Sequence, residues 1–386
     1  MRCFALLGIH EITLLVKRAA LEAGFELAGV APVREFDELA YFPQWIAEGH
    51  AGEMKYLEAR DEAGRLKRGS LQVAAPWARS VLVCAMNYNT AQPYSTQVDD
   101  PGRGWISRYA WGREDYHDVV LRKLREVEKR LTDAVARESE GNLVASAGLA
   151  STDVGGGASE GMRSPEARTW CYVDTGPIVE RVYAKYAGVG WIGKNTCVLN
   201  QKLGSWLFLG VVLTSLELVA DLPAPDRCGT CTRCLDACPT EAFVGPYQLD
   251  ANKCISYLTI EKRGAIPEEM REGMGRQVFG CDICQDVCPW NRKAPATQAS
   301  EFQPRAGLVN PALEWLAEMQ GEEFRASFRG SPVRRAKLSG LRRNAAIAMG
   351  NSGKREFIPT LEKFCQDDDS AIAESAAWAL RKLRRE

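Results

Sequence analysis

Eight of the thirteen cysteines in this 386-residue chain lie between positions 228 and 288, and their spacing limits the possible folds more than any other feature. The first run is Cys228-x2-Cys231-x2-Cys234-x3-Cys238-Pro239, and a shortened copy follows fifty residues later as Cys281-x2-Cys284-x3-Cys288-Pro289. The copies share an aspartate at the same offset, so they form an internal repeat. In bacterial ferredoxins this spacing gives three thiolates to one iron–sulfur cluster and the fourth to another.

The second copy lacks one cysteine, because Val278 stands where a complete copy would carry it, and the isolated Cys254 can replace it. Eight thiolates make two sets of four, which is what two [4Fe–4S] clusters require. Zinc is the alternative, but a four-cysteine zinc site needs neither the third cysteine of the run nor the Cys-Pro ends. Following the exchanged ligation of two-cluster ferredoxins, we assign one cluster to Cys228, Cys231, Cys234 and Cys288, and the other to Cys238, Cys254, Cys281 and Cys284.

The N-terminus and the lengths of the apolar runs indicate in which cellular compartment the protein is expected. The stretch Cys3–Ile9 imitates a short export signal, but His10 and Glu11 interrupt it and no small-residue cleavage site follows. No apolar run approaches the roughly 20 residues of a membrane span. We therefore expect a cytoplasmic protein without membrane contact, in which clustered cysteines bind metal. The scattered cysteines are expected in the core: Cys3, Cys84, Cys171, Cys197 and Cys365.

Residues 1–225 alternate between strand-like and helix-like segments, which predicts an α/β or α+β domain. Ser80–Met86 and Trp206–Leu216 are continuous apolar runs of the kind that buried strands show. Glu11–Gly24 and Glu114–Arg137 have helical periodicity. The stretch Gly141–Ala167 is rich in Gly, Ser and Ala and has no period, so we expect a flexible surface insertion.

The C-terminal end is basic, although the whole chain has a net charge of only −1. Residues 325–386 hold fourteen Lys or Arg against seven Asp or Glu. Three helical stretches, Leu341–Gly350, Ile358–Phe364 and Ala371–Leu383, predict a HEAT-like repeat pair. Such a basic end could bind the phosphate backbone of a nucleic acid, or it could be a solvated helix surface that binds nothing. Charge alone does not decide between the two. The expected architecture is α+β, with domains at 1–225, ferredoxin-like 226–300 and helical 301–386.

Two short motifs resemble known ligand sites without their structural context. Gly188–Asn195 (GVGWIGKN) fits G-x-G-x-x-G, but a helix-like segment, Ile178–Ala187, precedes the glycines where a nucleotide site needs a strand. We therefore expect these glycines to serve a sharp turn into a strand or close approach to a flat ligand. Asp115-x-His117 resembles the start of the pattern that supplies an axial histidine to some corrinoid proteins, but the glycine of that pattern is missing, so we expect no such role.

The chain has only three histidines, which favours a carboxylate as catalytic acid. Asp174 follows a strand-like run and precedes a Gly-Pro turn, a position well suited to chemistry. Taken alone, such an aspartate is more typical of a turn or a helix cap.

Over nearly its whole length the chain resembles the epoxyqueuosine reductases, which carry out the last step in making the modified tRNA base queuosine. The departure is the stretch Gly141–Ala167, which is longer than we expect in that family. Besides the eight cysteines, the resemblance rests on Ser107–Gly112 (SRYAWG), Tyr116-His117, Val173–Gly176 (VDTG), Gly188–Asn195, Cys254–Thr259 (CISYLT), Cys288–Asn291 (CPWN) and Ala377–Leu380 (AWAL).

The resemblance implies a base-off cobalamin between the N-terminal domain and the cluster module, reduced through two [4Fe–4S] clusters by an external low-potential donor. It also implies that Asp174 protonates the epoxide oxygen at the wobble position of tRNA, that Arg181 lies on the substrate side, and that the enzyme is a monomer. Corrinoid contacts are implied for Arg68, Asp174, Asn200, Ser256, Leu258 and Lys262, and contacts with the anticodon stem-loop for Arg334, Arg335, Lys337, Arg342 and Arg343.

Two other functions share part of this layout. A corrinoid reductive dehalogenase acting on a small organohalide would also carry two clusters, but such enzymes are typically exported by a twin-arginine signal and have no use for a basic tail. A non-catalytic electron-transfer protein would leave the N-terminal domain and Asp174 without a purpose.

Overall fold

The computed structural model describes residues 8–147 and 167–385. For residues 138–147 it describes the backbone only. At its centre is a sheet with strand order β1-β2-β7-β4, in which every neighbouring pair is antiparallel. The strands are β1 (Leu27–Pro32), β2 (Ser80–Asn87), β7 (Leu207–Thr214) and β4 (Thr169–Tyr172). Because no pair within this sheet is parallel, its connectivity is that of an α+β domain and not of an α/β domain.

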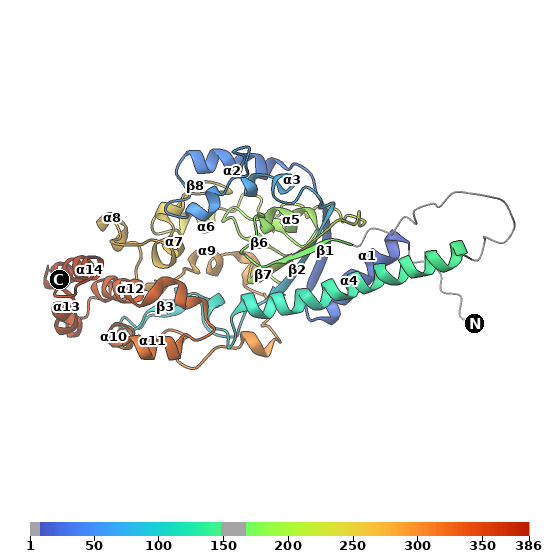
Figure 1. Cartoon of the computed structure of the whole chain (residues 1–386). Coiled ribbons are helices and arrows are strands. Elements are labelled where there is room, and N and C mark those ends of the chain that lie inside the picture. The colour runs from blue at the N-terminus through green and yellow to red at the C-terminus, as the bar shows by residue number, and fades with distance from the viewer. Residues whose placement is uncertain (1–7, 148–166, 386) are drawn as a thin grey trace.

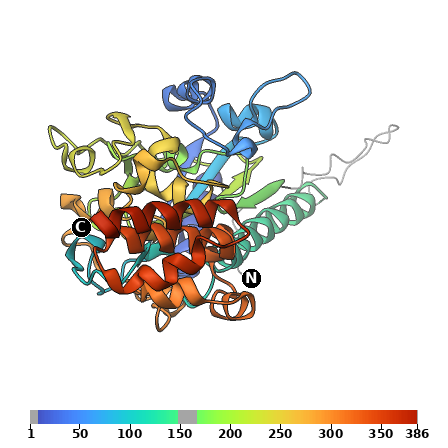
Figure 2. The ribbon, with the colours of Figure 1, turned by 90° about the vertical axis from the view of Figure 1, so that its left-hand side faces the viewer.

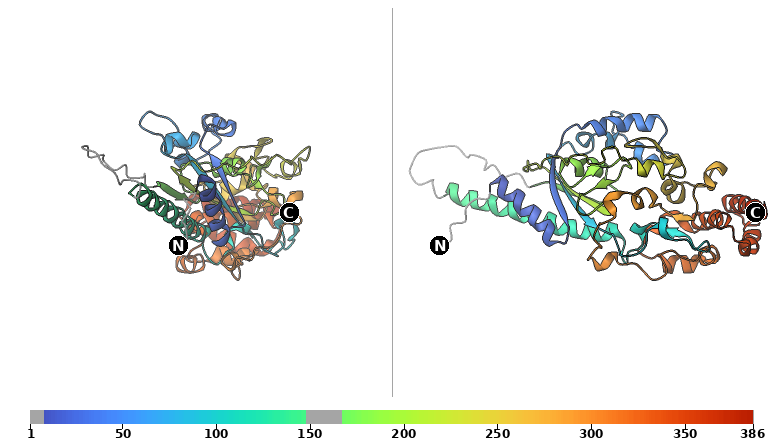
Figure 3. Two further views of the ribbon diagram at one scale, coloured as in Figure 1. Left: turned by 90° about the vertical axis from the view of Figure 1, so that its right-hand side faces the viewer. Right: turned by 180° about the vertical axis from the view of Figure 1, so that it is seen from behind.

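Helices cover both faces of this sheet (Figures 1 and 3). Leu82, Cys84 and Met86 of β2 pack in the same core as α1 (Ile9–Glu22) and α4 (Tyr116–Ala147). Their neighbours Val81, Val83 and Ala85 share a second core with residues of α2 (Asp37–Ala47), α3 (Leu71–Ala74) and α5 (Glu180–Tyr186). Burial on both faces explains the continuous apolar run that predicted this strand.

Helix α4 is longer than its sequence period indicates. It continues to Ala147, so the backbone of Gly141–Ala147 is helical where a flexible segment was expected, and the insertion at 141–167 stays a prediction. An isolated glycine does not end a helix, because it costs only about 1 kcal/mol relative to alanine. The remainder of the predicted insertion up to 166, and Cys3, lie outside the described residues.

The cysteine-rich segment folds around short helices and strands, and it is joined to the N-terminal domain by a buried carboxylate. Asp282 accepts hydrogen bonds from Trp105 Nε1 (2.9 Å), the Ser107 hydroxyl and the Arg108 amide (2.7 Å). Beside it, β10 pairs in parallel with β3. The elements are β3 (Trp105–Ile106), β5 (Trp191–Ile192), β6 (Val198–Leu199), α6 (Arg233–Asp236), β8 (Phe243–Gly245), β9 (Gln248–Leu249), α7 (Ile255–Ile260), α8 (Glu268–Arg271), β10 (Gln277–Phe279) and α9 (Ile283–Asp286).

The chain ends in five helices, of which α12 and α14 pack against each other in the foreground of Figure 2. They share one hydrophobic core with residues 105–111 and 251–279, so this core extends across the expected domain boundaries. Those boundaries, and the HEAT-like character of the repeat, stay predictions. The helices are α10 (Leu313–Glu318), α11 (Gly321–Ser327), α12 (Lys337–Asn351), α13 (Ile358–Phe364) and α14 (Ser370–Arg385). In the described part of the chain, no helix combines the length and the apolar character that a membrane crossing needs.

The close contact between α12 and α14 depends on Gly350, because a Cβ there would lie 2.7 Å from Ala379 Cβ and 2.8 Å from its Cα. We expect Gly350→Ala to destabilise the protein by about 1–3 kcal/mol, the usual range for overpacking. Gly340 in the same helix is the matched control, since its nearest neighbour is an ordinary 3.8 Å away and alanine raises helix propensity. In urea denaturation, the midpoint of Gly340→Ala should therefore be equal to or higher than that of the parent protein, and the midpoint of Gly350→Ala should be lower. Equal midpoints for the two variants would contradict this account of the interface.

Candidate active site

Asp174 lies in a tight turn directly after β4. Its φ is 61°, and the amide of Thr175 donates a 2.6 Å hydrogen bond to the carbonyl of Val173, which closes a three-residue turn around it. Non-glycine residues rarely adopt this left-handed conformation, and Asp and Asn tolerate it better than most. The side chain is 68 % exposed. The turn therefore holds a reachable carboxylate outside the sheet, in a conformation that costs backbone energy.

Two residues from the first turn of α4 contact this carboxylate. The Tyr116 hydroxyl donates to Asp174 Oδ2 at 3.1 Å, and His117 Nε2 lies 3.7 Å from the same oxygen. The other ring nitrogen of His117 is 2.8 Å from Asp115 Oδ1. The Tyr116 ring stacks on Phe208 of β7, with centroids 4.3 Å apart. Tyr116 is thus held by packing on the central sheet, and His117 by two carboxylates.

These contacts move the two pKa values in opposite directions. The ionic contact with His117 is the main reason that the pKa of Asp174 is lowered, and Tyr116 and Arg335 add to the effect. Burial alone would lower the pKa of His117, but Asp115 and Asp174 outweigh it and raise that pKa to about 9. At neutral pH the site therefore holds an ionised Asp174 beside a protonated His117.

Charged and aromatic side chains from distant segments surround Asp174. Tyr56, 48 % exposed in η1 (Lys55–Glu58), lies between the guanidinium carbons of Arg68 and Arg335, at 6.0 and 5.5 Å from its ring centroid. Arg335 also forms an ion pair with Glu261. The electrostatic influence of Asp174 reaches Tyr56 and Arg335. The structure thus brings the predicted residues Arg68, Asp174 and Arg335 into one place.

Glu180, at the start of α5, is a second carboxyl group beside Asp174. Its Oε1 is buried and has no hydrogen-bond partner. Burial, together with the charge of Asp174, raises its pKa to about 7. Two neighbouring carboxyl groups therefore have pKa values pushed apart, a pattern typical of acid–base sites.

The remaining residues predicted to touch substrate or corrinoid have local partners. Arg181 is exposed and donates to the carbonyl of Thr196 at 2.6 Å. The Asn200 amide donates to the Val189 carbonyl at 2.8 Å and accepts from the Lys202 amide at 2.9 Å. Ser256 is half-buried, Leu258 is buried, and Lys262 forms an ion pair with Glu53. Their roles stay predictions.

The basic residues of the C-terminal end divide into two kinds. Arg334, Arg335 and Lys337 are exposed. Arg343 is 2 % exposed, and its guanidinium donates to the carbonyls of Leu258 (2.8 Å), Lys262 (2.9 Å) and Gly264 (2.7 Å). Arg342 donates to the carbonyl of Met319 at 2.8 Å. Arg343 fastens α12 to the loop after α7, so the structure contradicts its expected contact with a phosphate backbone.

The eight clustered cysteines lie near one another, and their assignment to two sets of four stays a prediction. Cys234 lies within electrostatic reach of Cys228 and Cys231, and Cys288 within reach of Cys234 and Cys228. Cys281 is similarly close to Cys254 and Cys238, and Cys284 to Cys281 and Cys254. In residues 8–147 and 167–385 no three His, Cys, Asp or Glu side chains are close enough to share one metal ion. The four thiolates of a [4Fe–4S] cluster bind four different irons, so they do not need to converge on a single point.

Of the scattered cysteines, Cys84 lies in the core as expected, and Cys171 and Cys365 are half-buried. Cys197 differs, because it lies close enough to Cys284 for the pKa of its thiol to be lowered by that neighbour. It is therefore a neighbour of the second set rather than an unrelated core residue.

The glycine motif 188–195 leads into β5 and supports the cysteine loops. A Cβ at Gly190 would lie 2.3 Å from the carbonyl oxygen of Leu199, so the turn needs glycine there, as expected for a sharp entry into a strand. Lys194 Nζ donates to the carbonyls of Gly229 (2.7 Å) and Cys231 (3.0 Å), and Asn195 Nδ2 to that of Cys284 (3.2 Å).

Sequence reasoning missed the partners of Asp174, namely Tyr116, His117, Tyr56 and Glu180. Tyr116-His117 belongs to the motifs that carry the family resemblance, and Glu180 directly precedes the predicted Arg181. These were the available signals. Nothing in the sequence around Tyr56 indicates its place between two arginines.

Comparison with known proteins gives a consistent result. The family described as "4Fe-4S double cluster binding domain" matches residues 227–291, and "Epoxyqueuosine reductase QueG, DUF1730" matches residues 68–145. Epoxyqueuosine reductase of Pseudomonas aeruginosa is 39% identical over 373 residues (95% of this chain, 93% of the relative), and that of Escherichia coli K12 is 34% identical over 375 (97% and 90%).

Two solved structures share the fold over the same length. One is a crystal structure of epoxyqueuosine reductase with an epoxyqueuosine-modified tRNA-Tyr stem loop (TM-score 0.79, 28% identity, 97% of this chain and 91% of that chain). The other, from Bacillus subtilis, has an aspartate-bearing catalytic loop swung out of the active site (TM-score 0.78, 28% identity, 97% and 91%).

The charge on His117 can be tested by pH titration. Because its pKa is raised from 6.5 to about 9, the free energy of unfolding that the imidazolium contributes is complete below about pH 6.5 and is lost as the pH rises through about 9. An NMR titration of the three imidazoles should find His117 titrating near 9, and Asp115→Asn should lower that value. His50→Gln serves as the assignment control. An imidazole at position 117 that titrates at or below 6.5 would contradict the site described above.

Proposed function

The chain belongs to the epoxyqueuosine reductase family, and we propose that it reduces epoxyqueuosine to queuosine at the wobble position of tRNA. The observation that carries the proposal is the reachable Asp174 carboxylate, bound by Tyr116 and His117, in a chain that also matches a double-cluster domain. The catalytic aspartate loop named for the Bacillus subtilis relative supports giving this role to the Asp174 turn.

We propose two [4Fe–4S] clusters with the exchanged ligation, one on Cys228, Cys231, Cys234 and Cys288 and the other on Cys238, Cys254, Cys281 and Cys284. The match of residues 227–291 to a double-cluster domain supports the cluster type. The proximity of Cys288 to Cys234 and Cys228, across the repeat, supports the exchange.

We further propose that a base-off corrinoid lies over Asp174, near Arg68 and the loop after Cys254. The fit rests on Asp174 and Tyr56, whose side chains are exposed to solvent. Charged groups from distant segments, among them Arg68, Glu261 and Arg335, lie around them. When bound and reduced through the clusters, the corrinoid supplies the two electrons that convert the epoxide to an alkene. Asn200, Ser256, Leu258 and Lys262 stay candidate contacts.

The protein's own residues supply the protons. Removal of the epoxide oxygen as water consumes two electrons and two protons. His117, protonated at neutral pH and 3.7 Å from Asp174 Oδ2, is the source of the proton. In the proposed step the strongly basic oxygen freed by epoxide opening takes this proton by way of the Asp174 carboxylate. Glu180, with a pKa of about 7, keeps a second exchangeable proton beside Asp174.

For tRNA we propose a path along the exposed Arg334, Arg335 and Lys337, with Arg181 on the side of the modified base. The relative solved with a tRNA stem loop supports binding of an anticodon stem-loop. A base of a single-stranded loop can be splayed out into the pocket, as loop recognition usually requires.

The proposed function is tested by measuring turnover of the parent enzyme and of a variant at Asp174. Holoenzyme with cobalamin and a strong reductant should convert epoxyqueuosine in tRNA to queuosine, measured by nucleoside mass spectrometry. Asp174→Asn keeps the shape of the side chain and tolerance of φ 61°, and should lower kcat by about 10²–10⁴-fold. Asp118→Asn, on an exposed position of α4, is the matched control. Absence of turnover by the parent would refute the function, and full activity of Asp174→Asn would refute its role as acid.

The tRNA path predicts a change in salt dependence. Arg334→Glu with Lys337→Glu should weaken stem-loop binding and reduce the slope of log Kd against log salt concentration by about one per lost phosphate contact. Arg125→Glu, exposed on α4, is the control. Fluorescence anisotropy of a labelled stem-loop from 50 to 300 mM salt measures both, with roughly this range chosen for counterion release. An unchanged slope would place the RNA elsewhere.

A further inference from the structure

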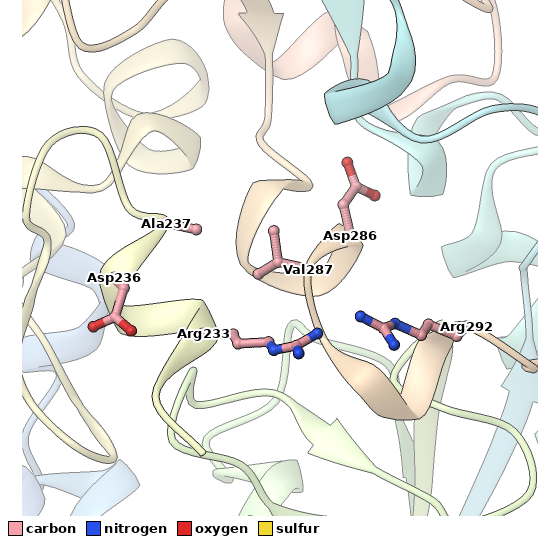
Figure 4. Close-up of a pocket in the computed structure, with 6 residues that line it drawn as sticks. All are labelled: Arg233, Asp236, Ala237, Asp286, Val287 and Arg292. Carbon is pink, nitrogen blue, oxygen red and sulfur yellow. The ribbon is translucent and has the colours of Figure 1, made fainter.

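A pocket opens between the two copies of the cysteine repeat, beside α6 and α9 (Figure 4). Each copy contributes the residues that flank its cysteines. The lining consists of Arg233, Asp236, Ala237, Asp286, Val287 and Arg292. Arg233 and Arg292 stand one and four positions from Cys234 and Cys288, so the basic side of the pocket borders the first proposed cluster. The other lining residues stand near cysteines of both sets.

Two unpaired guanidinium groups dominate this pocket. Figure 4 shows Arg233 and Arg292 extending toward each other from opposite sides, and neither makes a hydrogen bond or ion pair within the described parts of the chain. The two carboxylates are engaged elsewhere: Asp236 accepts from the Thr232 hydroxyl at 2.8 Å, and Asp286 from the Ser95 amide at 2.8 Å. Facing like charges repel, and an anionic group between them would relieve the repulsion and gain charge-assisted hydrogen bonds.

The surroundings fit a protein better than a small ion. Arg227 and Lys293, next to Cys228 and Arg292 in the sequence, are exposed and also without an ion pair in residues 8–147 and 167–385. Tyr247 is 42 % exposed and close enough to Cys228 and Cys234 to feel their charge. Basic side chains and an exposed aromatic ring thus lie close to the cysteines of the first set, and the Tyr247 hydroxyl is bound to Asp226. Arginine and aromatic side chains are enriched at protein interfaces.

The same face is the outer end of the electron path. The second set of cysteines lies toward Asp174, because Tyr109 is within electrostatic reach of both Asp174 and Asp282, the neighbour of Cys281. The first set borders the pocket. Electrons that leave the second cluster toward Asp174 must therefore enter through the first.

We propose that this face, centred on Arg233 and Arg292, is the docking site of a small acidic carrier protein that delivers single low-potential electrons to the first cluster. The proposal rests on the proposed function, because it needs both clusters. Each encounter oxidises one carrier by one electron, and two encounters supply the two electrons consumed with two protons per alkene and water formed.

The test compares two electron donors on the same holoenzyme. A bacterial flavodoxin with an acidic rim, reduced to its hydroquinone, is the protein probe, and reduced methyl viologen, a small cation, is the reference donor. In the double variant Arg233→Glu with Arg292→Glu, flavodoxin should bind at least about tenfold more weakly and its cluster reduction should lose most of its salt dependence. Cluster reduction by viologen should be unchanged or faster.

Calorimetry measures flavodoxin binding, and stopped-flow absorbance follows cluster reduction. Arg125→Glu with Arg130→Glu on α4 is the charge-matched control, and Arg233→Gln with Arg292→Gln should give an intermediate loss. Equal flavodoxin affinity in parent and double variant overturns the docking site. So does a double variant that loses stem-loop binding while keeping flavodoxin, because the face would then belong to RNA. Failure of the parent to turn over with viologen would instead refute the proposed function.

Discussion

The buried carboxylate of Asp282 is the interaction on which the arrangement of the two halves depends. It stands between Cys281 and Cys284 and receives donors from Trp105, Ser107 and Arg108, all in the segment that leaves the central sheet. A buried carboxyl group needs such hydrogen-bond donors. The same segment continues through Tyr109 to Tyr116 and His117 at the start of α4, so one short stretch of chain links a cysteine loop to the partners of Asp174.

In the proposed site, the partners of Asp174 are held rigidly while the carboxylate itself stays exposed to solvent. Tyr116 is packed on Phe208 of the central sheet, whereas Asp174 projects from a strained turn with most of its side chain open. The opposite pKa shifts of Asp174 and His117 follow from that geometry, since one oxygen is shared by a hydroxyl and an imidazolium. In the proposed function, this arrangement lets His117 resupply a proton from inside the protein while most of the Asp174 side chain stays exposed.

Sequence patterns predicted those features that depend on local spacing. The buried strand at 80–87 and the helix at 358–364 both follow from the apolar pattern. Features that depend on tertiary contacts could not be predicted. His117 contacts Asp174, which is 57 positions away in the sequence. Arg343 is buried, although a charge count does not distinguish it from the exposed Arg334. A charge count cannot tell a phosphate-binding arginine from one that caps three carbonyl groups inside the protein.

The proximity of Cys288 to Cys228 and Cys234 has a consequence for biosynthesis. If the first cluster takes its fourth thiol from Cys288, as proposed, the site cannot be complete until residue 288 has left the ribosome. By then the whole sheet, up to Thr214 of β7, has already been synthesised. Iron–sulfur loading would therefore come after the N-terminal domain has formed, and a truncated nascent chain ending before that cysteine would lack a complete first site.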